Sequence, residues 1–349
     1  MIGPMLARVL IIGALALAAC SAAAPAATPV PGAPAEAQSR VIPLAAPLNT
    51  PLAEISGLAW HGDDLILLPQ YPDRYGGLFA LRRQSILDAL DGRAEGPLRP
   101  RLVPLDEDGI PYRVGGYEGY ESIAFIGDQM FLTLETHRGL PGLGAMLGYI
   151  VAGQIAPDGS AASLSAMTRM EIPAQAGLDN TTDEAMTIVD GRLVTFYEAN
   201  GAAVNPRPVA HVFEPGPARL SVAASMTMTA LEYRLTDATP AGPDGRFWVI
   251  NYFFPGDRDK LKPAADPIAA RFGAGATHAA CPQVERLVEL RAAAGRIERT
   301  DTPPVQLTLL SCATARNWEG LAELPGRGFL LATDQHPETI LAFVAGAVR

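Results

Sequence analysis

The sequence predicts an all-β fold, and within that class a five-bladed β-propeller. A short hairpin pattern recurs along the chain, and further apolar strands follow each copy of it. A propeller blade is a four-stranded antiparallel sheet, so repeated four-strand units are its signature. No long stretch has the apolar spacing of a helix, which argues against a fold that alternates strands and helices.

The recurring hairpin has a polar residue before a short strand, a tight turn, a strongly apolar strand and a closing polar residue. Gly-Asp or Asp-Gly dipeptides in four of the turns favour hairpins. The spacing between the two polar positions is constant in four copies, and the last copy has one extra residue in its turn. The copies are ISGLAWHGDDLILLPQ (55–70), YESIAFIGDQMFLTLE (120–135), DEAMTIVDGRLVTFYE (183–198), TDATPAGPDGRFWVIN (236–251) and NWEGLAELPGRGFLLATDQHP (317–337).

Later strands complete each unit. An apolar run follows every hairpin, and the first four copies have a further strand after it. The fifth copy lacks this fourth strand before the last residue, Arg349, and residues 39–46, SRVIPLAA, resemble it. We expect this N-terminal strand to close the last blade, because that arrangement removes two sheet edges at once.

Two segments differ from the basic unit. Residues 84–93, QSILDALDGR, have helical apolar spacing and predict a short helix in the first blade. The gap between Asn251 and Glu319 is longer than the others, so a six-bladed propeller is the alternative. Its Pro- and Ala-rich middle, residues 263–280, is more typical of an insertion.

The first residues have the features of an export signal. One basic residue, Arg8, precedes an apolar run that ends in small residues, so residues 1–19 predict a lipoprotein signal peptide. LAAC at residues 17–20 has the form of a lipobox, in which Cys20 is acylated; a plain secretory signal with an incidental cysteine is the alternative. We expect a lipid-anchored protein of the periplasm, and Ser21 after the cysteine favours the outer membrane.

The mature chain divides into a tether and one domain. Residues 20–39 are rich in Ala and Pro and predict a tether, and residues 40–349 predict the propeller. Cys281 and Cys312 are left once Cys20 is set aside, and an oxidising compartment favours a disulfide over two buried thiols. The formal net charge is −10 and no basic stripe is present, so no nucleic-acid partner is expected.

Two rings of polar residues are expected at one mouth of the propeller channel. The first strand of a blade lines the channel and the second runs back, so the start of the first and the end of the second lie on the same face. Converging carboxylates require either raised pKa values or a bound cation. The first-strand ring is Ser56, Glu121, Glu184, Asp237 and Glu319, and the second-strand ring is Gln70, Glu135, Glu198, Asn251 and Asp334.

Calcium is the cation that these residues favour, because hard oxygen ligands predominate and no Cys/His cluster is present. A structural role is the alternative, in which the acids accept hydrogen bonds from backbone N–H groups of neighbouring blades. The predicted ligands are Glu121, Glu135, Glu184, Glu198, Asp237, Asn251, Glu319 and Asp334.

Loops on the same face supply candidate catalytic groups. His137 and His336 are placed to reach the mouth and are candidates for general acid–base catalysis. Arg74 and Arg138 are candidates for binding phosphate. Further polar residues expected on this face are Asp179, Asn180, Arg258 and Lys260.

Three of the hairpins resemble a known motif. EGLAELPGRGFLLATD, YESIAFIGDQMFLTLE and DEAMTIVDGRLVTFYE are similar to the repeated E-G-[IL]-A motif of the phytase-like propellers, a family described by the esterase-like activity of phytase. The likeness extends over residues 40–349. It implies an exported or lipid-anchored hydrolase of phosphoesters or carboxylesters, often with calcium. Glu121, Glu184 and Glu319 match the family's first-strand acids, whereas Ser56 and Asp237 depart from its pattern.

These observations favour a calcium-dependent hydrolase that acts on a phosphorylated or ester small molecule. A non-enzymatic platform for an envelope protein or glycan is one alternative, because the sequence offers no assembled nucleophile and base. A lactonase of the gluconolactonase type is another, since propeller folds host many functions.

Overall fold

The structure is a computed structural model that describes residues 34–138, 145–216 and 220–346. The predicted signal peptide, Cys20 and most of the predicted tether lie outside the described residues. Strands dominate the described part, and its helices are short. None of the helices in these ranges is long and apolar enough to cross a membrane.

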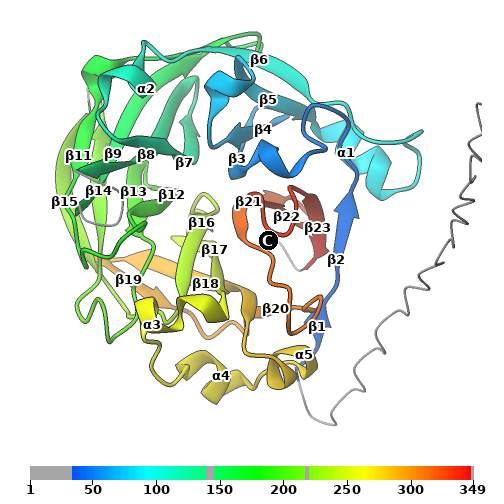
Figure 1. The fold of residues 1–349 in the computed structure, drawn as a ribbon, viewed down its shortest axis with the longest axis vertical. Helices are drawn as coiled ribbons and strands as arrows, with labels where there is room; N and C mark the ends of the chain where they lie inside the picture. The colour runs from blue at the N-terminus through cyan, green and yellow to red at the C-terminus, as the bar shows by residue number, and fades with distance from the viewer. Residues whose placement is uncertain (1–33, 139–144, 217–219, 347–349) are drawn as a thin grey trace, which may run out of the picture.

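In the described ranges, five antiparallel meanders follow one another, each opening with one of the predicted hairpins (Figure 1). The first is β3 (Ile55–His61), β4 (Asp64–Pro69), β5 (Gly77–Arg82) and β6 (Arg101–Asp106). The second is β7 (Tyr117–Ile126), β8 (Gln129–Arg138) and β9 (Ala145–Ile155), with β10 (Ala162–Leu164) and β11 (Met170–Ile172) both paired to β9. The third is β12 (Asp183–Val189), β13 (Arg192–Tyr197), β14 (Val209–Pro215) and β15 (Leu220–Met228).

The last two meanders have additional features. The fourth is β16 (Arg234–Ala238), β17 (Arg246–Phe253) and β18 (Val284–Ala293), with β19 (Arg296–Arg299) and β20 (Val305–Leu307) both paired to β18. The fifth is β21 (Trp318–Leu324), β22 (Gly328–Thr333) and β23 (Leu341–Ala345). Its fourth strand is β2 (Ser39–Ile42), which pairs antiparallel with β23 as predicted.

The first strands of the meanders contact one another in a closed circle. The order of contact is β3, β7, β12, β16, β21 and back to β3 (Figure 1). A circle of antiparallel sheets whose innermost strands touch is a β-propeller. The pairing of β2 with β23 joins the two ends of the described chain and closes the last meander, and we call this pairing the seam.

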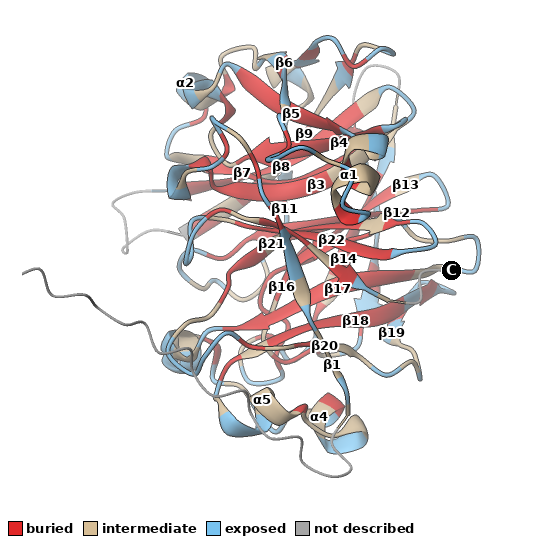
Figure 2. Ribbon diagram, turned by 90° about the vertical axis from the view of Figure 1, so that its right-hand side faces the viewer, coloured by how far each residue is buried: buried red, intermediate tan, exposed pale blue. Residues whose placement is uncertain are grey.

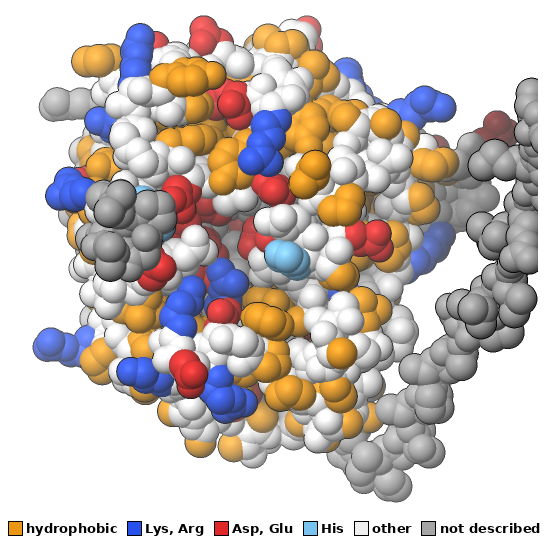
Figure 3. Space-filling view, in the orientation of Figure 1, with side chains coloured by type: hydrophobic (Ala, Val, Ile, Leu, Met, Phe, Trp, Pro, Cys, Tyr) orange, Lys and Arg blue, Asp and Glu red, His pale blue; other side chains and the backbone are white. Residues whose placement is uncertain are grey.

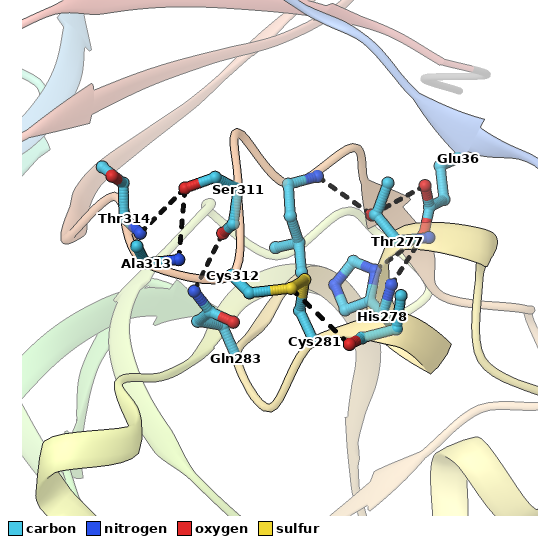
Figure 4. The surroundings of a disulfide bond; sticks show 11 residues. Glu36, Thr277, His278, Cys281, Gln283, Ser311, Cys312, Ala313 and Thr314 are labelled. Atoms are coloured by element: carbon cyan, nitrogen blue, oxygen red, sulfur yellow. Dashed lines mark hydrogen bonds and ion pairs between the residues drawn. A yellow bond between two sulfur atoms is a disulfide. The ribbon is translucent and has the colours of Figure 1, made fainter. Parts of the chain in front are cut away.

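The described fold includes residues before Arg40. β1 (Glu36–Ala37) pairs parallel with β20, so both of its residues, which lie in the predicted tether, are held by the fourth meander. Glu36 accepts hydrogen bonds from Thr277 and His278 of α5 (Ala276–Ala280) (Figure 4). Consecutive N-terminal strands thus bind the fourth and the fifth meander.

The core lies between neighbouring sheets, and β4 shows why its sequence is apolar throughout. Leu65 and Leu67 pack in the cluster shared with the fifth meander, whereas Ile66 and Leu68 pack in the cluster shared with the second. Successive side chains of a strand point to opposite faces, and both faces of this sheet are covered. Figure 2 shows the same pattern of buried strands and exposed loops across the molecule.

The segments outside the strands have the types of structure that the sequence predicts. α1 (Arg83–Leu90) is the predicted short helix, and it lies between β5 and β6. The insertion between β17 and β18 contains α3 (Arg258–Leu261), α4 (Pro267–Phe272) and α5 rather than further strands. Cys281 and Cys312 form the predicted disulfide, which links the end of the insertion to the segment before β21 (Figure 4).

Candidate functional site

The first strands carry an irregular register at the point where they begin. A β-bulge adds one residue to a strand and re-aims its side chain, and such irregularities often lie next to functional sites. The extra residues are Ser56 in β3, Glu121 in β7, Glu184 in β12 and Glu319 in β21. The repeated bulge therefore directs the same position of four strands toward the channel mouth.

Glutamate side chains from three meanders converge at this mouth. Glu121 interacts electrostatically with Glu184 and with Glu135 at the end of β8. Glu319 interacts with Glu184, with Glu121 and with Asp334 beyond the end of β22. Figure 3 shows a hollow at the centre of this face with acidic side chains around it. We call these five residues, together with Glu198, the acid cluster.

Burial raises the pKa of most of the acid cluster. It raises the pKa of Glu135 to about 8, with a further contribution from Glu184 and Glu118. It raises the pKa of Glu184 to about 7, although the cationic Arg234 and Lys260 oppose the rise. The pKa of Glu121 is raised by burial and by Glu135, and that of Glu319 by burial and by Asp334. Desolvation and like charges both favour the neutral carboxyl, so several of these groups retain protons near neutral pH.

Arg234, the first residue of β16, lies within the acid cluster. Its Nε contacts Glu198 Oε1, and its Nη2 is 3.8 Å from Glu184 Oε1. Its Nη1 is 3.7 Å from Asp257, in the loop after β17. Burial alone would lower the pKa of Arg234, but Glu184, Glu319 and Asp257 raise it, so the guanidinium stays charged.

Lys260 is a second cation beside the cluster. It lies in α3, and its Nζ donates to the carbonyl oxygens of Asp179 and Asn180 at 3.3 and 3.2 Å. Burial and the neighbouring Arg234 lower its pKa. The insertion of the fourth meander therefore reaches across to the loop before β12.

Two of the predicted ring residues do not face the acid cluster. Asp237 Oδ2 accepts from Leu321 N at 2.6 Å and its Oδ1 from Ala238 N at 2.8 Å, so this carboxylate bonds backbone groups. Asn251 Nδ2 donates to the carbonyls of Glu232 and Arg234, and its Oδ1 accepts from Arg286 Nε. The structural alternative therefore describes Asp237, which accepts from Leu321 N of the neighbouring meander, whereas Asn251 binds groups of its own meander.

The two ring residues of the first meander also make protein contacts. Ser56 Oγ donates to Tyr120 O at 2.7 Å, just before Glu121 in β7. Thr236 Oγ1 makes the matching contact to Trp318 O at 2.6 Å, just before Glu319 in β21. Gln70 Nε2 donates to Glu121 Oε1 at 3.2 Å. The hydroxyls of Ser56 and Thr236 thus join neighbouring first strands at places where no carboxylate enters the acid cluster.

The arrangement does not fit the predicted calcium site. Asp237 and Asn251 are bound elsewhere, and Glu198 is paired with Arg234. Within the described ranges, no three His, Cys, Asp or Glu side chains are placed to hold a metal ion. The counter-charge that converging carboxylates require is supplied here by a side chain of the protein.

The predicted histidines and arginines of the loops have other partners. His137 is buried with its Nδ1 at 2.5 Å from Glu118 and its Nε2 at 3.0 Å from Asp179, so both ring nitrogens are occupied. Its pKa is raised by these two carboxylates. His137 therefore ties the second meander to the loop before β12, and its ring has no free nitrogen for a substrate.

The remaining candidates lie at the rim. Arg74 forms an ion pair of 2.9 Å with Glu54 and lies over the Tyr71 ring, 3.8 Å from its centroid. Arg138 is exposed at the end of β8, and His336 is exposed beyond Asp334. His336 N donates to Asp334 Oδ1 at 2.7 Å. Burial raises the pKa of Asp334 and the His336 side chain opposes this rise, so His336 adjoins the acid cluster.

Sequence reasoning missed Arg234 and Asn317. Asn317 Nδ2 donates to Glu319 and to Asp334, at 2.9 Å to the latter, and so bridges two acids of the cluster. Arg234 lies three residues before Asp237, and the residue three before Glu319, Arg316, pairs with Glu285 instead. The signal that could have found Arg234 is charge balance, because buried carboxylates require a cation and Arg234 begins one of the two first strands that lack a ring glutamate.

The fold and the site together define a β-propeller with an acidic channel mouth that surrounds a buried arginine. No protein-family model matches the sequence, and no curated protein does. The chain is similar to the solved structure of a GH32 beta-fructofuranosidase from Bombyx mori, with 10% identity, a TM-score of 0.45 and 88% of this chain covered. It spans 62% of that enzyme, which is less than two thirds of its length.

Two further solved structures are similar at the same level. A GH43_1 enzyme from Xanthomonas citri has 12% identity and a TM-score of 0.46, over 89% of this chain and 91% of its own. A 6-phosphogluconolactonase from Bacteroides uniformis, so named provisionally, has 12% identity and a TM-score of 0.35, over 78% and 75%. At identities and TM-scores this low, we assign neither the fold nor any residue of this chain from these structures.

Proposed function

We propose that the chain is a five-bladed β-propeller hydrolase, with one meander per blade, that cleaves an ester bond of a small neutral molecule at the acidic channel mouth. The resemblance to phytase-like propellers favours ester hydrolysis. A mouth lined by carboxylates repels a phosphorylated substrate unless a cation intervenes, so a carboxylester or lactone suits it better than a phosphoester.

The observation that carries this proposal is the pair Glu184 and Glu135 beside Arg234. Both carboxyls are buried, and their pKa values of about 7 and about 8 place their titration near neutral pH. One oxygen of each, Glu184 Oε2 and Glu135 Oε1, has no hydrogen-bond partner among the described residues. An acid and a base with pKa values near the working pH are what general acid–base catalysis requires.

The chemistry assigns different roles to the two carboxyls. Glu184, closer to Arg234 and more readily ionised, is the base that takes a proton from water while the water oxygen attacks the ester carbonyl carbon. Glu135, which keeps its proton to higher pH, donates it to the alkoxide that leaves. The products are a carboxylic acid and an alcohol, and the two glutamates exchange their proton before the next turnover.

The test is hydrolysis of a panel of carboxylesters and lactones, with phosphoesters as a second panel. Glu184→Gln and Glu135→Gln are each expected to lower kcat by about 10²-fold or more, because each removes one proton-transfer group. Glu171→Gln, at an exposed position of β11, is the matched control and should keep full activity. Native protein that hydrolyses neither panel, or a fully active Glu184→Gln variant, contradicts the proposal.

The exported location is part of the same proposal. It rests on the lipobox at residues 17–20, which lies outside the described structure. Two or more acyl chains on one cysteine are enough for stable membrane anchoring. Cells labelled with radioactive palmitate should yield a labelled protein, and Cys20→Ala should abolish the label; label retained by that variant rules the anchor out.

A further inference from the structure

Arg234 is surrounded by carboxylates from three successive meanders. Glu198 and Glu184 come from the third, Asp257 from the loop after β17 in the fourth, and Glu319 from the fifth. The guanidinium is buried with only 12% of its side chain exposed. A charge this deep is tolerated only when it is paired. The acids and the arginine therefore depend on each other.

The backbone fixes Arg234 in this place. Asn251 Nδ2 donates to Arg234 O at 3.1 Å, and Leu235 N donates to Glu198 O at 2.9 Å. Arg234 also forms an isolated bridge with Ala199. The preceding residue, Tyr233, has a φ of 75°, a conformation that non-glycine residues rarely adopt. A residue in this rare conformation directly before Arg234 indicates that the position of the guanidinium is specified by the fold.

The cluster also has oxygens with no partner. Glu135 Oε1 and Glu184 Oε2 are buried, and neither has a hydrogen-bond partner in the described ranges. Both residues are more than nine-tenths buried. These oxygens belong to a group of side chains that attract cations, and the cations that act on the group are the Arg234 guanidinium and Lys260.

We propose that Arg234 is a built-in counter-cation that occupies the place of a divalent metal ion, so that the native site works without metal and loss of the arginine charge creates a calcium site. The inference concerns the same site as the proposed function, but it does not depend on any hydrolytic reaction. The inference has two parts. Native protein does not bind calcium at the mouth, and the carboxylates bind calcium once the charge of Arg234 is removed.

Calcium is the cation expected in the absence of Arg234. The remaining donors are carboxylate oxygens of Glu184, Glu198, Glu319 and Asp257, with no thiol or imidazole among them. Calcium takes six to eight oxygen ligands in flexible geometry, whereas magnesium demands a near-ideal octahedron. No three acids of the described ranges are placed to hold a metal ion while they surround the guanidinium, so they must move inward to bind one. Calcium tolerates the irregular geometry that results better than magnesium does.

The experiment compares calcium binding by native protein and by Arg234→Met, using isothermal titration calorimetry and thermal unfolding. Methionine is close to arginine in length and removes only the charged head. Native protein should give no binding heat and an unchanged Tm in millimolar CaCl₂. The variant should start with a lower Tm, bind calcium, and recover about 5 °C at a calcium concentration far above its Kd.

Arg286→Met is the matched control. Arg286 is buried more deeply than Arg234 and is also paired, with its Nη1 2.7 Å from Asp266 and its Nε 2.8 Å from Asn251. Arg286→Met should have a lower Tm than native protein, and that Tm should not change when calcium is added. Arg234→Lys, which keeps the charge, should behave as native protein does toward calcium.

Several results overturn the inference. Native protein that binds calcium at the mouth, with binding lost in Glu184→Gln, removes the first part whatever the variant does. A folded Arg234→Met that ignores calcium, or that responds no more than Arg286→Met, removes the second. If Arg234→Met unfolds without calcium, recovery of its near-ultraviolet circular dichroism on addition of calcium supports the proposal, and no recovery contradicts it.

The outcome is separable from that of the proposed function. Native protein that hydrolyses no ester but shows this pattern of calcium binding refutes the hydrolase alone. An active hydrolase that requires calcium refutes the built-in counter-cation alone.

Discussion

Asp237 and Glu319 were expected to occupy equivalent positions, yet their carboxylates have different surroundings. Glu319 lies in the acid cluster, whereas Asp237 accepts hydrogen bonds from Leu321 N and Ala238 N. In β16 the register shift spans Thr236 and Asp237 together, and Thr236 makes the contact that Ser56 makes in β3. The repeat predicted which positions correspond, but the direction of each side chain depends on the local bulge.

The raised pKa values predict how stability depends on pH. Glu135 and Glu184 bind protons in the folded protein at a pH where an exposed glutamate, with a pKa of about 4.3, does not. Their contribution to stability is therefore fully present below pH 4.3 and is lost as pH rises through about 7 and 8. Thermal unfolding should show a Tm that falls by several degrees between pH 5 and pH 9.

The same experiment on variants isolates the cause. Glu135→Gln and Glu184→Gln cannot ionise at that position, so each should flatten the fall in Tm over this range. A native Tm that is constant or rises between pH 5 and pH 9, with no difference in the variants, shows that these carboxyls are not held protonated.

At the scale of the elements, apolar runs were predictable and side-chain partners were not. β4 is buried on both faces, so its DLILLP sequence identifies it without any structure. The sequence predicts a helix at α1 and an insertion at residues 263–280, because helical apolar spacing and Pro content are properties of a short stretch of sequence. The ion pair of Arg234 with Glu198 joins different meanders, and no local pattern contains it.

The closing strand β2 offers the sharpest test at this scale. Ile42 is buried at 2% exposure in the seam, whereas its neighbour Val41 is 50% exposed on the opposite face. Ile42→Asp should cost more than about 3 kcal/mol of unfolding free energy, because it buries an unpaired charge where an apolar side chain packed. Val41→Asp should cost less than about 1 kcal/mol, since exposed substitutions have small effects.

Chemical denaturation measures both changes. Equal losses of stability in the two variants, or no loss in either, mean that β2 does not close the ring in solution. A loss confined to Ile42→Asp supports the pairing of β2 with β23.

For the whole molecule, the sequence predicts the propeller and its closing strand from the repeats, and the disulfide from the two cysteines left once Cys20 is set aside. The convergence of Glu121, Glu184 and Glu319 also followed from the repeat. The identity of the counter-charge could not be predicted from the repeat, because a guanidinium and a calcium ion both balance the same excess of negative charge. Only the placement of Arg234 by the fourth meander distinguishes them.

The central claim is that buried glutamates at the channel mouth stay protonated near neutral pH around a charged arginine. Infrared difference spectroscopy tests it directly, by following the carbonyl band of protonated carboxyl groups in native protein, Glu184→Gln and Glu135→Gln. The account predicts a band that persists at pH 6, falls between about pH 7 and pH 8, and is reduced in each variant. A native protein with no protonated carboxyl band above pH 5.5 contradicts it.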